Sequence, residues 1–278
     1  MTRLAIIADI HGNMPALEAV LADLDTLAPD AVIVDGDLVG RGPQSREVLE
    51  TIGATDWPVV AGNHEEFWLQ CAHGDTPTDW QDGWWTPTRA QLDGLQNGWI
   101  DWMAALPQEH VIDVPGLPPI QIVHGSPRRS NEGLHPFESE AKMLDALSTT
   151  PYRIVVGAHT HFPMNERVGP YWVLNTGSVG APFNHDPAAQ YLVLTAHDHT
   201  WQVELRRVSY DLTAALRIWH ETGYWESGVA ARIFAYELKT ARFHFWHYVR
   251  YCNAHDLGLN DDASFATYVR VADTIPEW

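Results

Sequence analysis

The chain has 278 residues, of which 45% are hydrophobic and 19% charged, a composition ordinary for a soluble globular protein with a large core. Seventeen lysines and arginines against 36 aspartates and glutamates give a formal charge of −19, which disfavours binding to long nucleic acid. No stretch approaches the roughly 18 apolar residues that a membrane span needs, so no membrane partner is expected. Two cysteines, Cys71 and Cys252, do not make a disulfide scaffold, and no signal peptide precedes the first strand, so we expect a cytoplasmic protein.

Short apolar runs predict buried β-strands in the first 160 residues. They are rich in β-branched side chains and end at glycine or polar residues, which is typical of central strands covered on both faces. A weaker strand is expected where Pro58 removes one backbone donor, at residues 57–60. The stronger runs cover residues 4–8, 31–34, 120–123 and 154–156.

Helical patterns lie between these runs. Residues 13–27 carry apolar side chains at helical spacing between the first two strands, which predicts a βαβ unit. Pro43 suits the first turn of a second helix that continues through Ile52. Residues 65–106 hold six tryptophans with glycines and prolines between them, and we interpret this stretch as a helical insertion that caps a crevice.

The last third of the chain changes pattern twice. Residues 171–174, 190–195 and 201–208 predict a meander that closes a second sheet. Helical spacing returns at residues 210–278, so we divide the chain into a domain of residues 1–209 and a helical extension packed on it. The aromatic side chains of this extension are expected to pack, and they also make it a candidate interface between copies of the chain.

Asp, Asn and His residues follow the predicted strands in five short segments. Because the carboxyl ends of strands in an open α/β sheet meet at one crevice, we expect these side chains to converge. Carboxylate, amide and imidazole ligands together suit first-row divalent ions, and there are enough of them for two ions about 4 Å apart. The candidates are Asp9, His11, Asp37, Asn63, His64, His124, His159 and His161, and residues 175–178 form an expected loop beside them.

These segments resemble the successive sequence blocks of the calcineurin-like metallophosphoesterase superfamily. The blocks are Asp9-x-His11, Gly36-Asp37-x-x-Gly40, Gly62-Asn63-His64-Glu65, His124-Gly125 and Gly157-x-His159-x-His161. Residues 124–128 and 175–180 are most similar to the small bacterial phosphodiesterase branch. An Arg-Gly pair at residues 41–42 is instead similar to protein phosphatases and diadenosine tetraphosphate hydrolases.

The resemblance implies a fold, a reaction and a ligand set. The fold is of the α/β class, a four-layer α/β/β/α sandwich of two mixed sheets flanked by helices. The reaction is phosphoester hydrolysis through attack by a metal-bridging hydroxide, with Mn²⁺ favoured over Fe, Zn²⁺, Ni²⁺ or Co²⁺ as the two cofactor ions. The superfamily pattern gives one ion Asp9, His11 and His161, the other Asn63, His124 and His159, and makes Asp37 the bridge.

Further residues are expected to act on the substrate. His64 is the expected general acid. In protein phosphatases of this fold the matching histidine is oriented by an aspartate, but this chain has Gly40 there, which leaves the partner of His64 open. Arg41 has a planar fork suited to phosphate oxygens, and Asn63 and Arg128 are further candidates for substrate binding.

Several alternatives stay open at this point. A tryptophan-rich insertion favours a small phosphodiester or a nucleotide as substrate, whereas the Arg41 turn leaves a phosphomonoesterase, a protein phosphatase or a diadenosine polyphosphate hydrolase. A non-catalytic scaffold of the same fold would not need the full ligand set. Two other histidine groups are set aside as metal sites. Residues 197–199 are expected in a turn between strands, and His244 and His247 in the aromatic packing of a helix.

Overall fold

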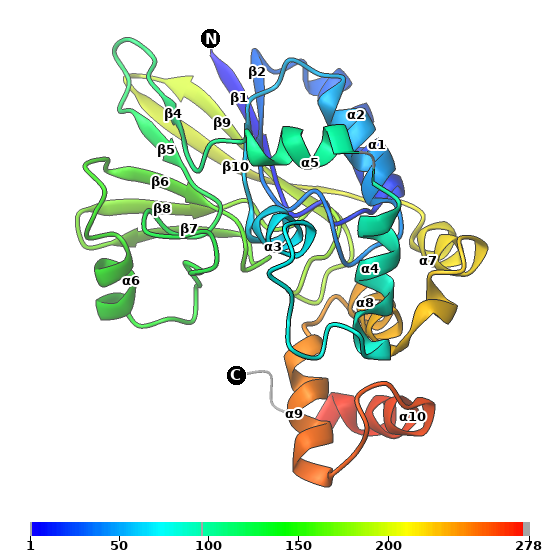
Figure 1. The fold of residues 1–278 in the computed structure, drawn as a ribbon. Helices are drawn as coiled ribbons and strands as arrows, with labels where there is room; N and C mark the ends of the chain where they lie inside the picture. The colour runs from blue at the N-terminus through cyan, green and yellow to red at the C-terminus, as the bar shows by residue number, and fades with distance from the viewer. Residues whose placement is uncertain (1, 96, 275–278) are drawn as a thin grey trace.

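The computed structural model describes residues 2–95 and 97–274, and within them the strands form two mixed five-stranded sheets (Figure 1). The first has the order β10-β9-β1-β2-β3 and the second β4-β5-β6-β8-β7. In the first sheet, β1, β2 and β3 are parallel and β9 is antiparallel to β1. The strands are β1 Arg3–Ile7, β2 Ala31–Asp35, β3 Val59–Val60, β4 His110–Ile112, β5 Ile120–Ile122, β6 Ile154–Gly157, β7 Met164–Val168, β8 Tyr171–Asn175, β9 Ala189–His197 and β10 Thr200–Val208.

Both faces of the central strands are covered, which explains their continuous apolar sequence. On β1, Leu4 and Ile6 point into a core between the two sheets, where they meet side chains such as Ile122 and Leu174 of the second sheet. Ala5 and Ile7 point the other way, into a core under α1 (Met14–Leu27) and α2 (Ser45–Gly53). The outer face of the second sheet is covered by α6 (Glu140–Ala146). These layers confirm the predicted four-layer sandwich.

The predicted meander is wrong in its pairing. The strands exist, but β9 and β10 extend the first sheet, with Leu4 opposite Leu194, while β8 pairs with β6 and β7 in the second. Sequence alternation indicates a strand and its buried face but not its neighbour, because pairing is a long-range contact. Pro43 also lies before α2, which begins at Ser45. The short strand β4 and the edge strand β7, which buries only its two end residues, were not predicted.

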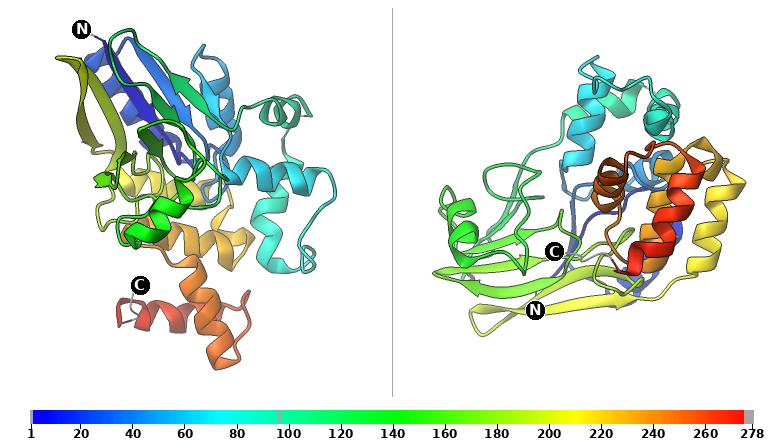
Figure 2. Two further views of the ribbon diagram at one scale, coloured as in Figure 1. Left: turned by 90° about the vertical axis from the view of Figure 1, so that its left-hand side faces the viewer. Right: turned by 90° about the horizontal axis from the view of Figure 1, so that it is seen from below.

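Helices occupy both stretches that were predicted to be helical additions. The insertion holds α3 (Asn63–Ala72), a 3₁₀ turn at Gly83–Trp85, α4 (Thr86–Asp93) and α5 (Asn97–Ala104). The C-terminal part holds α7 (Leu212–Glu221), α8 (Val229–Thr240), α9 (Phe245–His255) and α10 (Asp262–Val271). Helices α4 and α8 lie beyond the carboxyl ends of β1 and β2, and α9 and α10 project further outward (Figures 1 and 2). In the part of the chain that the structure describes, no helix has the length and apolar character to span a membrane.

The insertion divides into two parts with different roles. Trp99 and Trp102 pack against the outer core of the first sheet, and a Cβ at Gly53 would lie 2.6 Å from the Trp99 ring. Trp84 instead contacts the C-terminal helices, with its ring 5.2 Å from that of Phe245 and stacked on Tyr248 at 5.9 Å. The part of the insertion that holds Trp84 therefore lies near the carboxyl ends of the strands, whereas the part that holds Trp99 and Trp102 lies on the outer core.

Candidate active site

The predicted ligands converge through an unusual local backbone. Asp9, His11, Asp37, His159 and His161 all have φ between 51° and 60°, in the left-handed region that non-glycine residues seldom adopt. Each lies in the turn that follows β1, β2 or β6, and the turn redirects the side chain toward the crevice. Such strained positions cluster at active sites, where the surrounding structure holds them in place.

Four side chains form a first buried cluster. The ligand atoms of Asp9, His11, Asp37 and His161 lie within 4.8 Å of one another. His161 Nε2 is 3.2 Å from Asp9 Oδ1, and His11 Nε2 is 3.6 Å from Asp37 Oδ2. These are the residues that the superfamily resemblance assigns to one ion and to the bridge.

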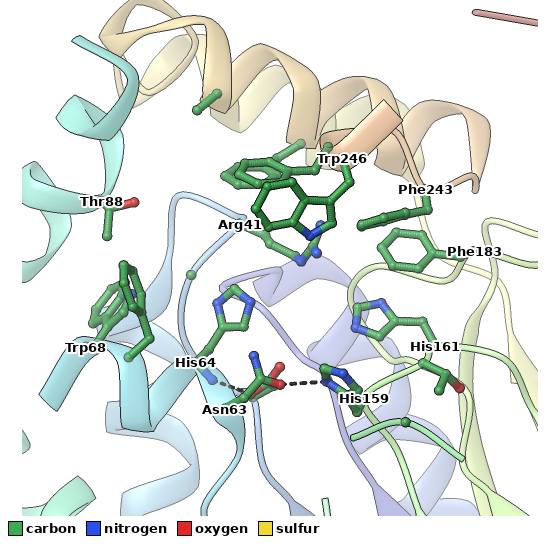
Figure 3. Close-up of a pocket in the computed structure, with 18 of the residues that line it drawn as sticks. Arg41, Asn63, His64, Trp68, Thr88, His159, His161, Phe183, Phe243 and Trp246 are labelled. Carbon is green, nitrogen blue, oxygen red and sulfur yellow. Dashed lines mark hydrogen bonds between the residues drawn. The ribbon is translucent and has the colours of Figure 1, made fainter. Parts of the chain in front are cut away.

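A second cluster shares Asp37 and adds His124 and His159. His124 Nε2 lies 3.3 Å from Asp37 Oδ2 and 3.2 Å from Asn63 Oδ1. Asn63 Oδ1 is also 2.7 Å from His159 Nδ1 (Figure 3). Asp37 thus occupies the position between the clusters that a bridging ligand requires.

The hydrogen bonds around the first cluster fit a cation at its centre. His11 Nδ1 donates to Val39 O at 3.2 Å, and His161 Nδ1 donates to Ala181 O, because a carbonyl oxygen can only accept. In the neutral rings both Nε2 atoms then carry lone pairs, yet they face each other at 3.2 Å. Asp9 Oδ1 beside them is buried without a hydrogen-bond donor among the described residues. A divalent ion would accept all these lone pairs, and the carbonyls fix the rings for it.

The second cluster shows the same arrangement. His124 Nδ1 donates to Asp35 O at 2.7 Å, which leaves the His124 Nε2 lone pair facing the oxygens of Asp37 and Asn63. Burial lowers the pKa of His124, but the Asp37 carboxylate and other acids raise it more, and the net shift is well upward. A proton on the His124 ring would therefore supply positive charge where the second cluster would otherwise hold a metal ion.

Two further ligand imidazoles, His159 and His11, favour the neutral form that metal binding requires. Burial, together with the charge of a protonated His124, lowers the pKa of His159 to about 4. Burial also lowers the pKa of His11 well below its ordinary value. Both clusters therefore fit first-row divalent ions.

Glu65 is a functional residue that sequence reasoning did not find. This fully buried carboxylate accepts from the backbone N–H groups of Asp37 and Leu38, each at 2.8 Å, and of Gly62 at 2.9 Å. It therefore fixes the loop of the bridging ligand against the start of α3. A glutamate at the third position of a helix, three residues after Gly62, is the capping-box signal that could have indicated it.

The end of β8 and the loop after it hold two of the ligand turns in place by hydrogen bonds. Asn175 donates to Ala158 O at 2.6 Å, and Ser178 Oγ donates to Asp9 O at 2.8 Å. The predicted loop at residues 175–178 thus lies beside the site and braces two of its ligand turns.

His64 stands at the open side of the clusters without an orienting carboxylate. Its backbone N–H donates to Asp37 Oδ1 at 2.8 Å, while its ring Nδ1 is buried and has no hydrogen-bond partner among the described residues. Gly40 has φ +81°, and a Cβ there would collide with His64 Nδ1. The ring therefore occupies the space that an aspartate at this position would need. Burial lowers the pKa of His64 to about 4, although the nearby Asp37 carboxylate opposes this.

Arg41 reaches the site but is already paired. Its guanidinium forms an ion pair with the buried Glu237 of α8 and lies 5.2 to 5.8 Å from the ring centres of Phe183, Phe234 and Phe243. The arginine thus joins the ligand turns to the C-terminal helices, a contact across 196 positions of sequence.

Other sequence candidates lie elsewhere. Arg128 pairs with Glu132 at 2.7 Å and Asp145 at 2.9 Å, and it is not among the residues that line the pocket above the ligands. Phe183 stacks on the His161 ring at 4.3 Å.

The two histidine groups that were set aside lie outside both ligand clusters. His197 is the last residue of β9, and Asp198 and His199 form the turn between β9 and β10. His244 shares a hydrogen bond with Tyr268 at 2.8 Å, and His247 packs near Phe243. Among the described residues, neither belongs to a cluster that could hold an ion.

A pocket of about 550 Å³ opens above the ligands. Figure 3 shows Asn63, His64, His159 and His161 on its floor, with Trp68 and Thr88 of the insertion on one side and Phe243 and Trp246 opposite. Its size falls in the range of small-molecule sites. The remaining aromatic walls are Phe67, Trp84, Trp85, Phe183, Phe234 and Phe245.

Comparison with known proteins agrees with this geometry. The family model described as the calcineurin-like phosphoesterase superfamily domain matches residues 2–199. A metallophosphoesterase from Sphaerobacter thermophilus has a similar structure, with a TM-score of 0.68 and 25% identity over 86% of this chain and 99% of that one.

Two protein sequences are also similar. An uncharacterised protein of Methanocaldococcus jannaschii is 25% identical over 76% of this chain and 89% of its own length. A symmetrical bis(5'-nucleosyl)-tetraphosphatase of Paracidovorax citrulli is 42% identical, but over only 24% of this chain and 25% of its own.

Proposed function

Since this chain belongs to the calcineurin-like phosphoesterase superfamily and carries a buried Asp/His cluster suited to metals, we propose that it hydrolyses a small phosphodiester or nucleotide with two first-row divalent ions. The observation that carries the proposal is the pair of ligand clusters that share Asp37. Mixed oxygen and imidazole ligands accept several first-row ions, and Mn²⁺ is the one that we propose.

The ligands define what the cofactor would contribute. Asp9, His11 and His161 would hold one ion, Asn63, His124 and His159 the other, and Asp37 both. Two such ions, when bound, supply a hydroxide nucleophile at neutral pH and neutralise charge on the phosphoryl oxygens. The chain's own part is to fix this geometry through the backbone carbonyls behind the histidines.

His64 is the proposed general acid for the departing alkoxide. The ring stands over the floor of the pocket, on the side away from His161 (Figure 3). With a pKa of about 4 in the free protein, it needs the negative charge of a bound phosphate to hold a second proton near neutral pH.

Arg41 is the proposed phosphate-orienting residue. Its Nη1 is bound by Glu237, and the partly exposed side chain lines the pocket, where its other N–H groups would serve a phosphate oxygen. The ion pair keeps the side chain from swinging away from the pocket.

A second candidate function is hydrolysis of a dinucleoside polyphosphate. The similar protein of Paracidovorax citrulli is named a symmetrical bis(5'-nucleosyl)-tetraphosphatase, and the Arg41 turn also favours this substrate or a phosphomonoester. The short matched length makes it the weaker alternative. A non-catalytic scaffold has no need for two complete ligand clusters.

The first experiment measures hydrolysis of bis(p-nitrophenyl) phosphate and p-nitrophenyl phosphate by metal-stripped protein before and after addition of Mn²⁺. Metal-dependent turnover with preference for the diester supports the proposal, and preference for the monoester supports the phosphatase alternative. Asp37→Asn is the control and should abolish turnover. No turnover of either ester by protein that binds two ions per chain would contradict the proposal.

A further inference from the structure

The pocket above the ligands has a floor and walls of opposite character. Most of the ionisable side chains of its lining lie on the floor, at Asp37 and the three histidines at positions 64, 159 and 161, while the Arg41 guanidinium packs against the wall rings of Phe183, Phe234 and Phe243. Apart from Arg41, the described wall residues include no carboxylate, lysine or arginine, and the polar side chains beside them are Thr88, His135 and Thr160. A ligand that fits must therefore carry its charge at the floor and a neutral, largely apolar group above it.

The walls are built from flat rings held in fixed orientation. Phe245 stacks on Phe234 at 5.5 Å with an interplanar angle of 6°, and Trp84 packs on Phe245 from the insertion side. Glu237 accepts from the backbone N–H groups of His244 and Phe245, each at 2.7 Å, which fixes the turn that carries Phe243. The same carboxylate binds Arg41, so the aromatic wall and the phosphate-orienting residue are held in register.

Trp246 is the ring most open to a ligand. Its side chain is 56% exposed, although large apolar residues are usually buried, and it lies over the pocket opposite Trp68 (Figure 3). The ring contacts Phe245 at 5.1 Å but leaves much of its surface open, so a bound partner explains a tryptophan here better than packing does.

We propose that this aromatic pocket is a subsite for the nucleobase of a phosphodiester substrate, an inference that rests on the proposed function. Every nucleobase offers planar faces to aromatic rings, and a stacked base contributes roughly 5- to 150-fold in affinity. The cavity of about 550 Å³ has room for a nucleotide, with its phosphate on the charged floor. A nucleoside also complements the neutral walls, whereas a charged peptide side chain would lose its solvation there.

The test uses two diesters with the same leaving group. Thymidine 5'-(p-nitrophenyl) phosphate and methyl p-nitrophenyl phosphate both release p-nitrophenol, so a difference between them reports on the other ester group. With the Mn²⁺-loaded protein, we expect kcat/KM for the thymidine ester to fall at least fivefold in Trp246→Ala, while kcat/KM for the methyl ester changes less than twofold. Trp246→Phe should recover most of the loss.

Phe137→Ala is the matched control, because Phe137 is a 64% exposed ring outside the pocket and its removal should change neither ester. Equal effects of Trp246→Ala on both esters, or no effect on either, would overturn the proposal. Phe243→Leu gives a second test within the wall, in case Trp246→Ala folds poorly.

Calorimetry separates the subsite from catalysis. The Mn²⁺-loaded protein should bind thymidine 5'-monophosphate at least fivefold more tightly than 2-deoxyribose 5-phosphate, and Trp246→Ala should remove the difference. If neither diester is hydrolysed but this preference is present, the proposed function fails and the subsite stands. Equal affinity for the two monophosphates would overturn the subsite.

Discussion

Single residues at this site do their work through hydrogen bonds whose direction is fixed. His64 is the exception, since its buried ring Nδ1 has no hydrogen-bond partner among the described residues, and its proposed role as general acid is tested by substitution. We expect His64→Ala to lower turnover of a poor alkyl leaving group by 10²- to 10⁴-fold, but turnover of a nitrophenyl ester much less, because an activated leaving group needs no proton. Equal losses on both esters would assign His64 to phosphate binding instead.

Glu65→Gln tests the backbone bonds behind the bridging ligand. A glutamine places an NH₂ group against the N–H donors of Gly62, Asp37 or Leu38, where a carboxylate accepts from all three. We expect the free energy of unfolding to fall by about 2–4 kcal/mol and metal affinity to fall with it, as measured by urea unfolding and metal titration. The exposed Glu47→Gln, in the first turn of α2, is the control and should be neutral. Unchanged stability in Glu65→Gln would show that these bonds are dispensable.

At the level of whole elements, α8 is joined to the ligand turns by one buried ion pair. In Glu237→Gln the amide oxygen can still accept from the turn after α8, but Arg41 loses its anionic partner. We expect KM for the phosphodiester and the inhibition constant of inorganic phosphate to rise about tenfold, with kcat changed much less, because Arg41 is no longer held over the floor. Glu226→Gln, an exposed pair partner of His220, should leave both constants unchanged. A fall in kcat alone would contradict the positioning role.

Helix α1 is joined to β10 by a second ion pair that makes stability depend on pH. Asp23 accepts from Arg206 Nε at 2.9 Å and Nη2 at 2.8 Å, and these bonds lower the pKa of Asp23. The stabilisation is therefore present above the ordinary aspartate pKa of about 3.9 and is lost as the pH falls through the lowered value.

Asp23→Asn should lower the free energy of unfolding of the metal-free protein by roughly 1 kcal/mol at pH 7, and this difference from wild type should shrink below about pH 4. Urea unfolding of both proteins at pH 7, 5 and 3.5 measures it. Glu204→Gln, which removes an exposed partner of the same arginine, should have a smaller effect. A difference that persisted or grew in acid would contradict the assignment.

For the whole molecule, metal binding and folding should be coupled. Without an ion, lone pairs on His11 and His161 face each other and Asp9 Oδ1 has no donor, so ligand turns with strained φ are held against repulsion. We expect EDTA to lower Tm and Mn²⁺ to restore it. One bound ion should raise the free energy of unfolding by about 2.7 kcal/mol when the free ion is at 100 times its Kd. Asp37→Asn should reduce this shift, and a Tm that did not respond to metal would contradict the fit of the clusters.

The sequence predicted the local features of this molecule better than the distant ones. Strands covered on both faces and polar residues at their ends are visible in short runs, which is why the sandwich and the convergence of these polar side chains could be predicted. The assignment of seven of them as metal ligands comes from the superfamily resemblance and stays a prediction. The pairing of β9 with β1 and of Arg41 with Glu237 joins segments almost two hundred positions apart, and no local pattern encodes either contact. Glu65 was overlooked because it acts on backbone N–H groups, most of them in a turn far from it in sequence, and not on the substrate or a metal ion.

The contact between Trp84 and Phe245 has a further consequence for how such a protein changes over time. Residues that would perform the chemistry come from turns between positions 9 and 161, whereas much of the pocket wall comes from the insertion and the C-terminal helices. Substitutions in those two parts can reshape the wall while the ligand turns stay as they are. Proteins with this architecture can therefore evolve new substrate preferences while they keep the residues that would perform the reaction.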